Sequence, residues 1–262
     1  MNYLFTICGR AGSKGFKNKN LKEFLNIPLV FYSLAAISLY AERFGETDVI
    51  NVALNTDSEQ LINTVSKQHE IRPLVIRRCE ELSGDFVPKV SVIRDCLVRS
   101  EEEYKIEFDM VIDLDITSPL RLVEDIKAAI DKKNARNDTD VVFSVTSARR
   151  NPYFNMVKEE NGYFSKAFAS RYTARQQAPV FYDMNASIYA YSPVALTSKT
   201  ANVFFNDKAD AILMMDTGIL DIDSEEDFEL LQAIASVYAK LTTFSDVWEK
   251  AEFLKVQSQS TT

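Results

Sequence analysis

Residues 4–20, LFTICGRAGSKGFKNKN, form the stretch that decides the fold. The apolar run at 4–8 predicts a buried strand, and the strand leads into a basic loop rich in glycine. The loop holds these glycines and cations: Gly9, Gly12, Gly15, Arg10, Lys14, Lys17 and Lys19. Glycines let a backbone approach a ligand closely, and exposed N–H groups form an anion-binding concavity. In a chain of net charge −8, this loop predicts a strongly negative ligand such as a triphosphate.

Two phosphate-binding motifs fit this loop poorly. The P-loop pattern requires Ser or Thr after its lysine, whereas Gly15 follows Lys14. The glycine spacing is only loosely similar to the dinucleotide fingerprint, which needs a helix at once and an acidic residue about 20 positions later. A solvated basic loop remains the alternative interpretation.

Composition limits the class of protein. A length of 262 residues with 46% apolar residues suits one large α/β domain. No apolar run approaches the ~20 residues of a membrane span, and the start of the sequence has no signal-peptide pattern, so a cytoplasmic protein is expected. Three widely spaced cysteines form no metal or disulfide pattern. The acidic balance argues against a nucleic-acid binder. With His69 as the one histidine, chemistry must rest on Lys, Arg, carboxylates and amides, with or without an oxygen-bound metal.

Strand and helix patterns alternate along most of the chain. Strands are expected at 4–8, 49–54, 74–77, 109–114, 140–146, 186–191 and 211–215. Helices are expected at 28–43, 59–68, from about 90 to 103, 123–133, 225–240 and 245–256. This alternation predicts an α/β fold whose sheet is mostly parallel, with helices on both faces.

The regular alternation stops at residue 148. Residues 148–185 contain turn signals and short extended pieces, which predict an antiparallel excursion that covers a substrate or meets another subunit. We therefore expect one domain over residues 1–240 that includes this excursion. Residues 241–262 are expected to form a C-terminal helix and a polar tail, QSQSTT, that is disordered.

Polar loops follow the carboxyl ends of the predicted strands. They lie at residues 9–20, 55–58, 79–86, 115–121 and 221–223. Ligands of parallel α/β sheets bind at that edge, so we expect these loops to converge on one site.

Two aspartates offer a metal site. Asp221 and Asp223 would share one face of an extended segment, and paired carboxylates suit Mg²⁺. The alternative is that Asp221, Asp223 or Ser224 only caps the helix that follows.

Other polar residues are candidates for substrate binding. Thr117, Ser118 and Arg121 either hold a ligand or cap the next helix. The amide of Asn20 can bond a ribose or a phosphate. Arg175 and Gln176 belong to a polar cluster suited to a carboxylate or a sugar, unless it is a solvated basic loop, and Asn185 can donate at a strand entry.

Taken in order, six motifs resemble the acylneuraminate cytidylyltransferase family, whose members make CMP-sialic acids and related CMP-nonulosonates. The motifs are GRAGSKGFKNKNL at 9–21, LNTDSE at 54–59, ELSGD at 81–85, TSPLR at 117–121, RQQAPVFYDMNASIY at 175–189 and LDIDSEEDF at 220–228. The resemblance implies a Rossmann-like nucleotidyltransferase. It also implies that the excursion, near residues 148–180, is a dimerisation element. A homodimer is therefore expected.

The resemblance also implies roles for single residues. Arg10, Ser13 and Lys19 would contact the phosphates of CTP, and Gly12, Lys14 and Gly15 share their loop. Asn20 would hold the ribose or a phosphate. Leu82, Ser83 and Asp85 lie where the family recognises cytidine. Arg175, Gln176 and Asn185 would face a nine-carbon 2-keto sugar acid. Asp221 and Asp223 would hold the cofactor Mg²⁺.

One departure from the family bears on the acceptor. The run before TSPLR is usually Leu-Gln-Pro, whereas this chain has Leu114-Asp115-Ile116. Because this Gln normally contacts the acceptor sugar, the Asp115 found here means that the acceptor need not be N-acetylneuraminate itself. The alternative acceptors are 3-deoxy-manno-octulosonate, legionaminate- or pseudaminate-type acids and a sugar 1-phosphate. The expected reaction is attack of the acceptor hydroxyl on the α-phosphorus of CTP. A non-catalytic nucleotide-binding protein and a nicotinamide-dependent oxidoreductase are the competing functions.

Overall fold

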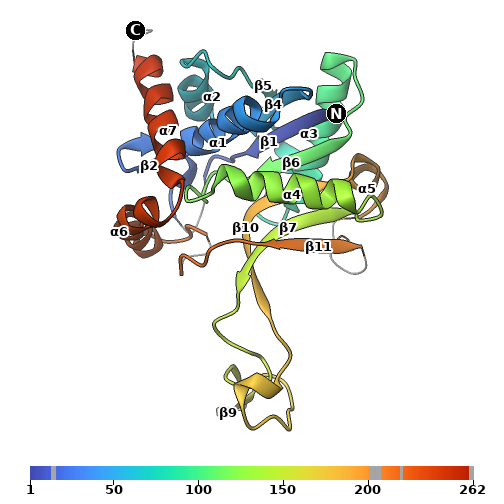
Figure 1. The fold of residues 1–262 in the computed structure, drawn as a ribbon, viewed down its shortest axis with the longest axis vertical. Helices are drawn as coiled ribbons and strands as arrows, with labels where there is room; N and C mark the ends of the chain where they lie inside the picture. The colour runs from blue at the N-terminus through green and yellow to red at the C-terminus, as the bar shows by residue number, and fades with distance from the viewer. Residues whose placement is uncertain (13–15, 201–203, 205–207, 219–220, 260–262) are drawn as a thin grey trace.

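A seven-stranded sheet forms the centre of the protein in a computed structural model, which describes residues 1–12, 16–200, 204, 208–218 and 221–259 (Figure 1). Its order is β11-β7-β10-β6-β1-β4-β5. The strands are β1 (Asn2–Cys8), β4 (Val49–Thr56), β5 (Leu74–Arg77), β6 (Met110–Leu114), β7 (Val141–Ser147), β10 (Tyr182–Tyr191) and β11 (Ala209–Leu213). β10 runs antiparallel to β6 and β7, and the other pairs are parallel. The predicted mostly parallel sheet is confirmed.

Helices cover both faces because β1 alternates its side chains between two cores. Tyr3, Phe5 and Ile7 belong to the larger core, and Leu4 belongs to the smaller one. The larger core receives α1 (Leu29–Phe44), α4 (Val123–Ala135), α6 (Glu225–Leu241) and α7 (Phe244–Gln259). The smaller core receives α3 (Lys89–Tyr104) and α5 (Pro193–Ser198), and α2 (Glu59–Ser66) packs beside β4.

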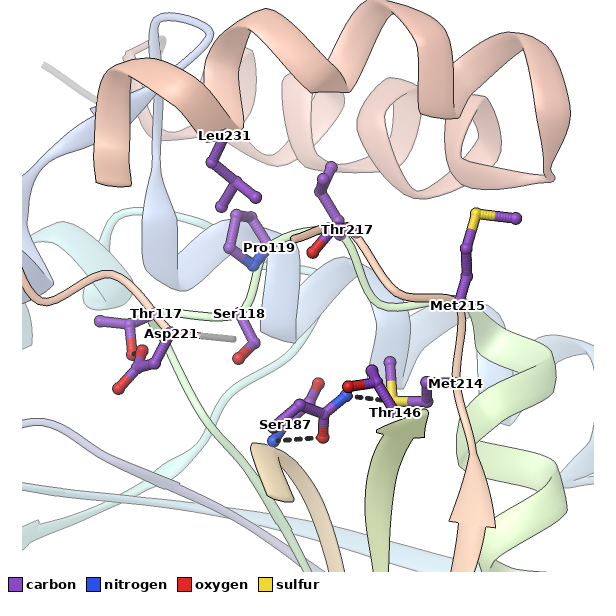
Figure 2. Close-up of a pocket in the computed structure, with 12 residues that line it drawn as sticks. Thr117, Ser118, Pro119, Thr146, Ser187, Met214, Met215, Thr217, Asp221 and Leu231 are labelled. Atoms are coloured by element: carbon purple, nitrogen blue, oxygen red, sulfur yellow. Dashed lines mark hydrogen bonds between the residues drawn. The ribbon is translucent and has the colours of Figure 1, made fainter. Parts of the chain in front are cut away.

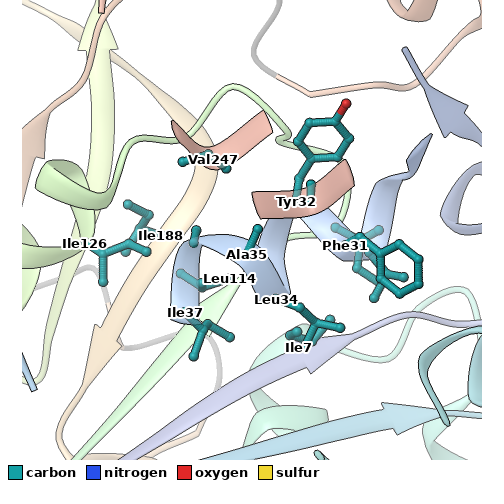
Figure 3. Close-up of a cluster of buried hydrophobic side chains, with 14 of the residues drawn as sticks. Ile7, Phe31, Tyr32, Leu34, Ala35, Ile37, Leu114, Ile126, Ile188 and Val247 are labelled. Carbon is teal, nitrogen blue, oxygen red and sulfur yellow. The ribbon is translucent and has the colours of Figure 1, made fainter. Parts of the chain in front are cut away.

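α1 is the central helix of the larger core. Each of its residues from 29 to 40 is buried. Figure 3 shows Leu34 of α1 beside Ile7 of β1, with Val247 of α7 on the opposite side of the helix. α1 is therefore enclosed between the sheet and α7, which explains why its sequence is apolar on every side.

The expected elements agree with the structure to within a few residues, with one correction at the C-terminus. The tail from residue 257 was expected to be disordered, but α7 continues to Gln259. Leu254 is fully buried, and the hydroxyl of Ser258 donates to the carbonyl of Lys255. These contacts extend the helix by another turn. Residues 260–262 of the expected tail lie outside the described residues.

An antiparallel hairpin projects from the sheet, as the break at residue 148 predicted. β8 (Val157–Glu160) pairs with β9 (Tyr163–Lys166) at the lower end of Figure 1. The short pieces β2 (Glu23–Phe24) and β3 (Ile27–Pro28) form a second two-stranded sheet. Over the described residues no helix is long and apolar enough to cross a membrane. The three cysteines are free thiols.

Candidate active site

Five loops meet at the carboxyl edge of the parallel strands, as the sequence predicted. The backbone N–H of Ala11 donates to Asp57, and Arg10 pairs with Asp85. Lys89 pairs with Asp115. Thr117 hydrogen-bonds Asp221, which in turn lies 3.6 Å from Lys19. These contacts join the loops after β1, β4, β5, β6 and β11 into one site.

The glycine loop is fixed at its two ends. The amide of Asn20 donates to the carbonyl of Arg10 at 3.0 Å. At Gly9, a Cβ atom would lie 2.7 Å from Ile116 Cδ1 and 2.8 Å from Leu61 Cδ2, so a larger residue would have to displace these two side chains. Gly12 has φ of +70°, a conformation that favours glycine. Ser13, Lys14 and Gly15 lie outside the described residues.

Asp57 is a site residue that the sequence analysis did not select. Its carboxylate accepts the N–H of Ala11 at 2.6 Å. The cap of α2 is made by Ser58, whose hydroxyl accepts the N–H of Leu61. The sequence feature that could have identified Asp57 is the pair Asp57-Ser58 before a helix. Only one of the two residues is needed as the cap of α2, so the other is available to hold the glycine loop.

A cavity of about 240 Å³ opens beside the glycine loop. Its lining is Cys8, Arg10, Lys19, Asn20, Arg78, Leu82, Gly84, Asp85, Val87, Lys89, Val92 and Asp115. Arg10 and Asp85 form an ion pair in this lining, with Arg10 Nη1 2.6 Å from Asp85 Oδ1. Ser83, expected near cytidine, is absent from this lining, and its hydroxyl donates to the carbonyl of Cys79. We call this space the loop cavity.

A buried charge cluster forms the floor of the loop cavity. Lys89 Nζ lies 2.8 Å from Asp113 Oδ2 and 2.6 Å from Asp115 Oδ2. Burial alone would lower the pKa of Lys89, but the two carboxylates raise it well above its ordinary value. Burial likewise opposes the charge of Asp115, yet Lys89 and Thr117 hold its pKa below the usual range. Asp115 is therefore an ionised group oriented by its neighbours.

Lys19 lies between the two predicted metal-binding aspartates. Its ammonium is 3.6 Å from Asp221 and 3.2 Å from Asp223, and it donates to the carbonyl of Ile222. Burial and the charge of Asp115 raise the pKa of Asp221, while Lys19 opposes that shift. α6 is capped by Ser224 through a capping box, so neither aspartate is needed as the cap.

The aspartates offer a metal only part of a coordination shell. Over the described ranges no group of three or more His, Cys, Asp or Glu is placed to hold a metal ion. Two hard carboxylates, with water and substrate phosphates, are nevertheless the donor set that Mg²⁺ uses in nucleotide sites. The chemistry of these two donors is therefore compatible with Mg²⁺.

A second cavity, of about 30 Å³, is lined in part by Thr117, Ser118 and Asp221 (Figure 2). Its lining is Thr117, Ser118, Pro119, Leu120, Thr146, Asn185, Ser187, Met214, Met215, Thr217, Asp221 and Leu231. The Thr117 hydroxyl is hydrogen-bonded to Asp115 and to Asp221, at the boundary of the two cavities. Thr117, Ser118, Asn185 and Asp221 are thus brought together as expected. We call this space the threonine cavity.

Arg121 requires a correction. It was a candidate for ligand binding, but its side chain is buried. Its guanidinium donates to the carbonyls of Asp115 and Ser187 and to the hydroxyl of Ser33. Burial lowers its pKa to about 10. Arg121 therefore supports the loop after β6 from within and does not reach either cavity.

Arg175 and Gln176 are also placed away from the cavities. They lie on the short helix η3 (Arg175–Gln177), and both are exposed. Arg175 donates to the carbonyl of Ala148 at the base of the projecting segment. Within one chain, these two residues do not join the other candidates.

Comparison with known proteins agrees with this geometry. A family model described as cytidylyltransferase matches residues 4–242. The chain is 35% identical over 234 residues to the CMP-N,N'-diacetyllegionaminic acid synthase of Campylobacter jejuni, covering 89% of this chain and 95% of that protein. It is 34% identical over 229 residues to the post-translational flagellin modification protein B of Campylobacter coli, covering 87% and 93%.

A solved structure supports the fold. The CTP complex of CMP:2-keto-3-deoxy-manno-octonic acid synthetase has a TM-score of 0.59 at 15% identity, covering 90% of this chain and 99% of that chain. Together with the family match over most of the sequence, the Rossmann-like sheet and the converging loops lead to one conclusion. The chain belongs to the cytidylyltransferase family of nucleotidyltransferase enzymes.

Proposed function

We propose that this enzyme joins CMP to a nine-carbon 2-keto sugar acid, a sialic acid or a related nonulosonate, with release of pyrophosphate from CTP. The names of the relatives support this acceptor class: besides the legionaminic acid synthase, they include an N-acylneuraminate and a pseudaminic acid cytidylyltransferase. The observation that carries the proposal is the contact of two cavities at Thr117, Asp221 and Lys19.

The loop cavity suits CTP. Arg10 and Lys19 supply positive charge, and the glycine loop and Asn20 supply hydrogen-bond donors for phosphates. The segment that contains Leu82 and Asp85 would contact the cytidine. The acceptor would lie against the opening of the threonine cavity, where the polar side chains Ser118 and Asn185 can bind sugar hydroxyls; at about 30 Å³ the cavity admits only a small part of the sugar.

In the proposed reaction the anomeric hydroxyl oxygen of the acceptor attacks the α-phosphorus, its proton passes to Asp221, to Asp223 or to water, and the bond from the α-phosphorus to the bridging oxygen of the β-phosphate breaks to release pyrophosphate. Such transfers depend on alignment and on stabilisation of charge rather than on covalent catalysis by the protein. Lys19, at the junction of the cavities, would stabilise the charge that develops on the phosphate oxygens. Arg10 would orient the triphosphate.

Asp221 and Asp223 would hold Mg²⁺. When bound, the ion neutralises phosphate charge and fixes the geometry of the triphosphate. The ammonium of Lys19 lies beside both carboxylates. Binding of Mg²⁺ there would displace the ammonium, and Lys19 would then move toward the phosphates of the nucleotide. The use of CTP also favours action in the cytoplasm.

The projecting hairpin would join two copies of the chain. Its exposed apolar side chains include Tyr163 (80% exposed) and Phe164 (71%). An isolated two-stranded hairpin is at best marginally stable in water, which favours burial against a second copy. A homodimer would also explain why Arg175 and Gln176 lie far from the cavities of their own chain.

A panel of acceptors tests the proposal. Pyrophosphate release would be measured with CTP and Mg²⁺ against N-acetylneuraminate, legionaminate- and pseudaminate-type acids and the eight-carbon acid 3-deoxy-manno-octulosonate. Turnover with a nine-carbon acid is expected. Turnover with the eight-carbon acid alone would replace the acceptor class, and CTP binding without turnover for any acceptor would contradict the proposed activity.

A further inference from the structure

Two buried hydroxyl groups in the lining of the threonine cavity have no hydrogen-bond partner among the residues that the structure describes. Their oxygens are Thr146 Oγ1 and Ser118 Oγ. Thr146, at the end of β7, is only 3% exposed. A buried polar group without a partner destabilises a folded protein, and native proteins contain few of them. Valine has a methyl group in place of the hydroxyl and would avoid this cost, so the Thr146 hydroxyl points to a ligand.

The strand beside Thr146 is distorted where it borders the cavity. The register of β10 against β7 shifts within residues 184–189, and Ala186 has φ of +54°. A positive φ is uncommon outside glycine, and bulges of this kind occur beside active sites, where they redirect a side chain. Here the side chain is Asn185, whose oxygen accepts from Ser144 Oγ at 2.5 Å. Its amide N–H donates to the sulfur of Met214, a weak acceptor, at 3.4 Å.

The charges around the cavity favour a neutral group. Among the described residues, the lining has one carboxylate, Asp221, and no lysine, arginine or histidine. A carboxylate of the acceptor would lose water there without gaining a cation. The group that enters the cavity is therefore not the acid group of the sugar.

The Thr146 hydroxyl is accompanied in the lining by apolar side chains. These are Pro119, Leu120, Met214, Met215 and Leu231, and Figure 2 shows Met214 beside Thr146. An acylamino group combines a strong acceptor, its carbonyl oxygen, with an apolar methyl group. A sugar hydroxyl would instead bring a second donor against these apolar side chains. At about 30 Å³ the cavity admits a small substituent and excludes a sugar ring.

We propose that Thr146 is a specificity-determining residue, whose hydroxyl donates to the carbonyl oxygen of an acylamino substituent of the acceptor. The methyl group of that substituent packs against the apolar lining. The inference rests on the proposed function, since it requires the acceptor at the opening of the threonine cavity. Thr146 selects the acceptor and takes no part in phosphoryl transfer.

A matched pair of acceptors tests the role of Thr146. Pyrophosphate release would be measured with CTP and Mg²⁺ for an N-acylated nine-carbon 2-keto acid and for its analogue with a hydroxyl in place of the acylamino group. The wild type should prefer the N-acylated acid by about tenfold in kcat/KM, the scale of one hydrogen bond. Thr146→Val should lose most of this preference through a higher KM for the N-acylated acid, with kcat retained. Thr146→Ser, which keeps a hydroxyl, should retain the preference.

Urea unfolding without substrates gives an independent readout. Thr146→Val should unfold at a higher urea concentration than the wild type, because it removes a buried hydroxyl that has no partner. Ser100→Ala is the matched control, since Ser100 Oγ is another such hydroxyl, on α3 and outside the lining of both cavities. Ser100→Ala should also be stabilised, and its acceptor preference should equal that of the wild type.

Three results would overturn the inference. They are an unchanged acceptor preference in Thr146→Val, equal use of the two acceptors by the wild type, and a lower urea midpoint for Thr146→Val. In each case, turnover of a nine-carbon acid by the wild type would still uphold the proposed function. Absence of turnover with every nine-carbon acid would overturn both.

Discussion

At the scale of single residues, carboxylates of the protein contact the cations and the backbone N–H group that are proposed to bind the substrates. Arg10 contacts Asp85, the N–H of Ala11 contacts Asp57, and Lys19 contacts Asp221 and Asp223. These contacts neutralise the charges of Arg10 and Lys19. CTP with its metal would replace them by stronger charge-assisted contacts.

Lys19 is the residue whose removal should affect the chemical step most. Lys19→Ala should lower kcat by about 100- to 1,000-fold, as loss of one transition-state donor does, with a smaller change in KM for CTP. Steady-state kinetics of pyrophosphate release measure both. Lys127→Ala, which removes a surface lysine paired with Asp131, is the control. A loss confined to KM would make Lys19 a binding residue only.

Asp223 tests the metal site. Asp223 is largely exposed, and no cap depends on it, so Asp223→Ala should fold normally. It should lose most turnover at ordinary magnesium and recover part of it at high magnesium. Near-normal activity at ordinary magnesium would contradict the assignment. Asp216→Ala, which removes an aspartate paired with Arg149, should leave the magnesium dependence unchanged.

The sequence predicted these residues unequally. Lys19 was selected from the basic glycine loop and the family resemblance, Asp221 from its spacing to Asp223, and Thr117 from its place directly after a strand. Arg121 was assigned wrongly because a motif does not show whether a guanidinium turns toward a ligand or toward backbone carbonyls of its own chain. Asp57 was missed because an aspartate just before a helix is already explained by capping, and the sequence does not show that Ser58 makes the cap.

At the scale of elements, the position of the glycine loop depends on side chains from other strands. Asp57 holds it from the end of β4. A hydrogen bond to a charged group stabilises a folded structure by about 1.5–3 kcal/mol. The contact with Asp57 therefore helps to hold the loop in the conformation that is proposed to bind phosphates.

Removal of this contact should weaken nucleotide binding. Asp57→Ala should raise the Kd for CTP about tenfold through loss of a charged hydrogen bond, and Asp57→Asn, which retains an acceptor oxygen, should raise it less. Calorimetry checks both variants. Tighter binding by Asp57→Ala would show instead that Asp57 competes with the phosphates.

The start of α4 contains a pH-dependent contact. Asp125 accepts the N–H of Leu122, but burial raises its pKa to about 6. Because the pKa is raised in the folded state, the stabilising contribution is present below the ordinary pKa near 4 and is lost as pH rises through 6. Asp125→Asn does not titrate and keeps an acceptor oxygen. It should therefore be more stable than the wild type by about 3 kcal/mol at pH 8, with little difference at pH 4.

Urea unfolding at several pH values measures this difference directly. Comparison of the variant with the wild type at each pH removes the contributions of other titrating groups. A stability difference that is constant between pH 4 and pH 8 would contradict the raised pKa.

At the scale of the whole molecule, the sheet and the hairpin have separate roles. The sheet brings five loops to one edge, and the alternation of strands and helices predicted this arrangement. The element ends were less accurate, because caps and tertiary contacts decide them: α7 continues to Gln259 since its last turns pack on the body of the protein. Sequence patterns also did not show that β10 would run antiparallel between two parallel neighbours.

The projecting hairpin should control the oligomeric state. Phe164→Asp places a charge on an exposed apolar position of β9, and we expect it to shift a dimer to monomer by desolvation of that charge at the interface. Analytical ultracentrifugation measures the shift. Val194→Asp, at a comparably exposed position on α5, should leave the dimer intact. A wild type that is monomeric at micromolar concentration would remove the proposed role of the hairpin.

In the proposed reaction an acceptor bound at the threonine cavity attacks the α-phosphorus of CTP in the loop cavity. Mass spectrometry of the products formed from CTP, Mg²⁺ and a nine-carbon 2-keto sugar acid tests this most directly. The account predicts a CMP-linked sugar and pyrophosphate in equal amounts. A sugar phosphate with CDP would show attack at another phosphorus, and would contradict the placement of Lys19 and Thr117 at the reacting centre.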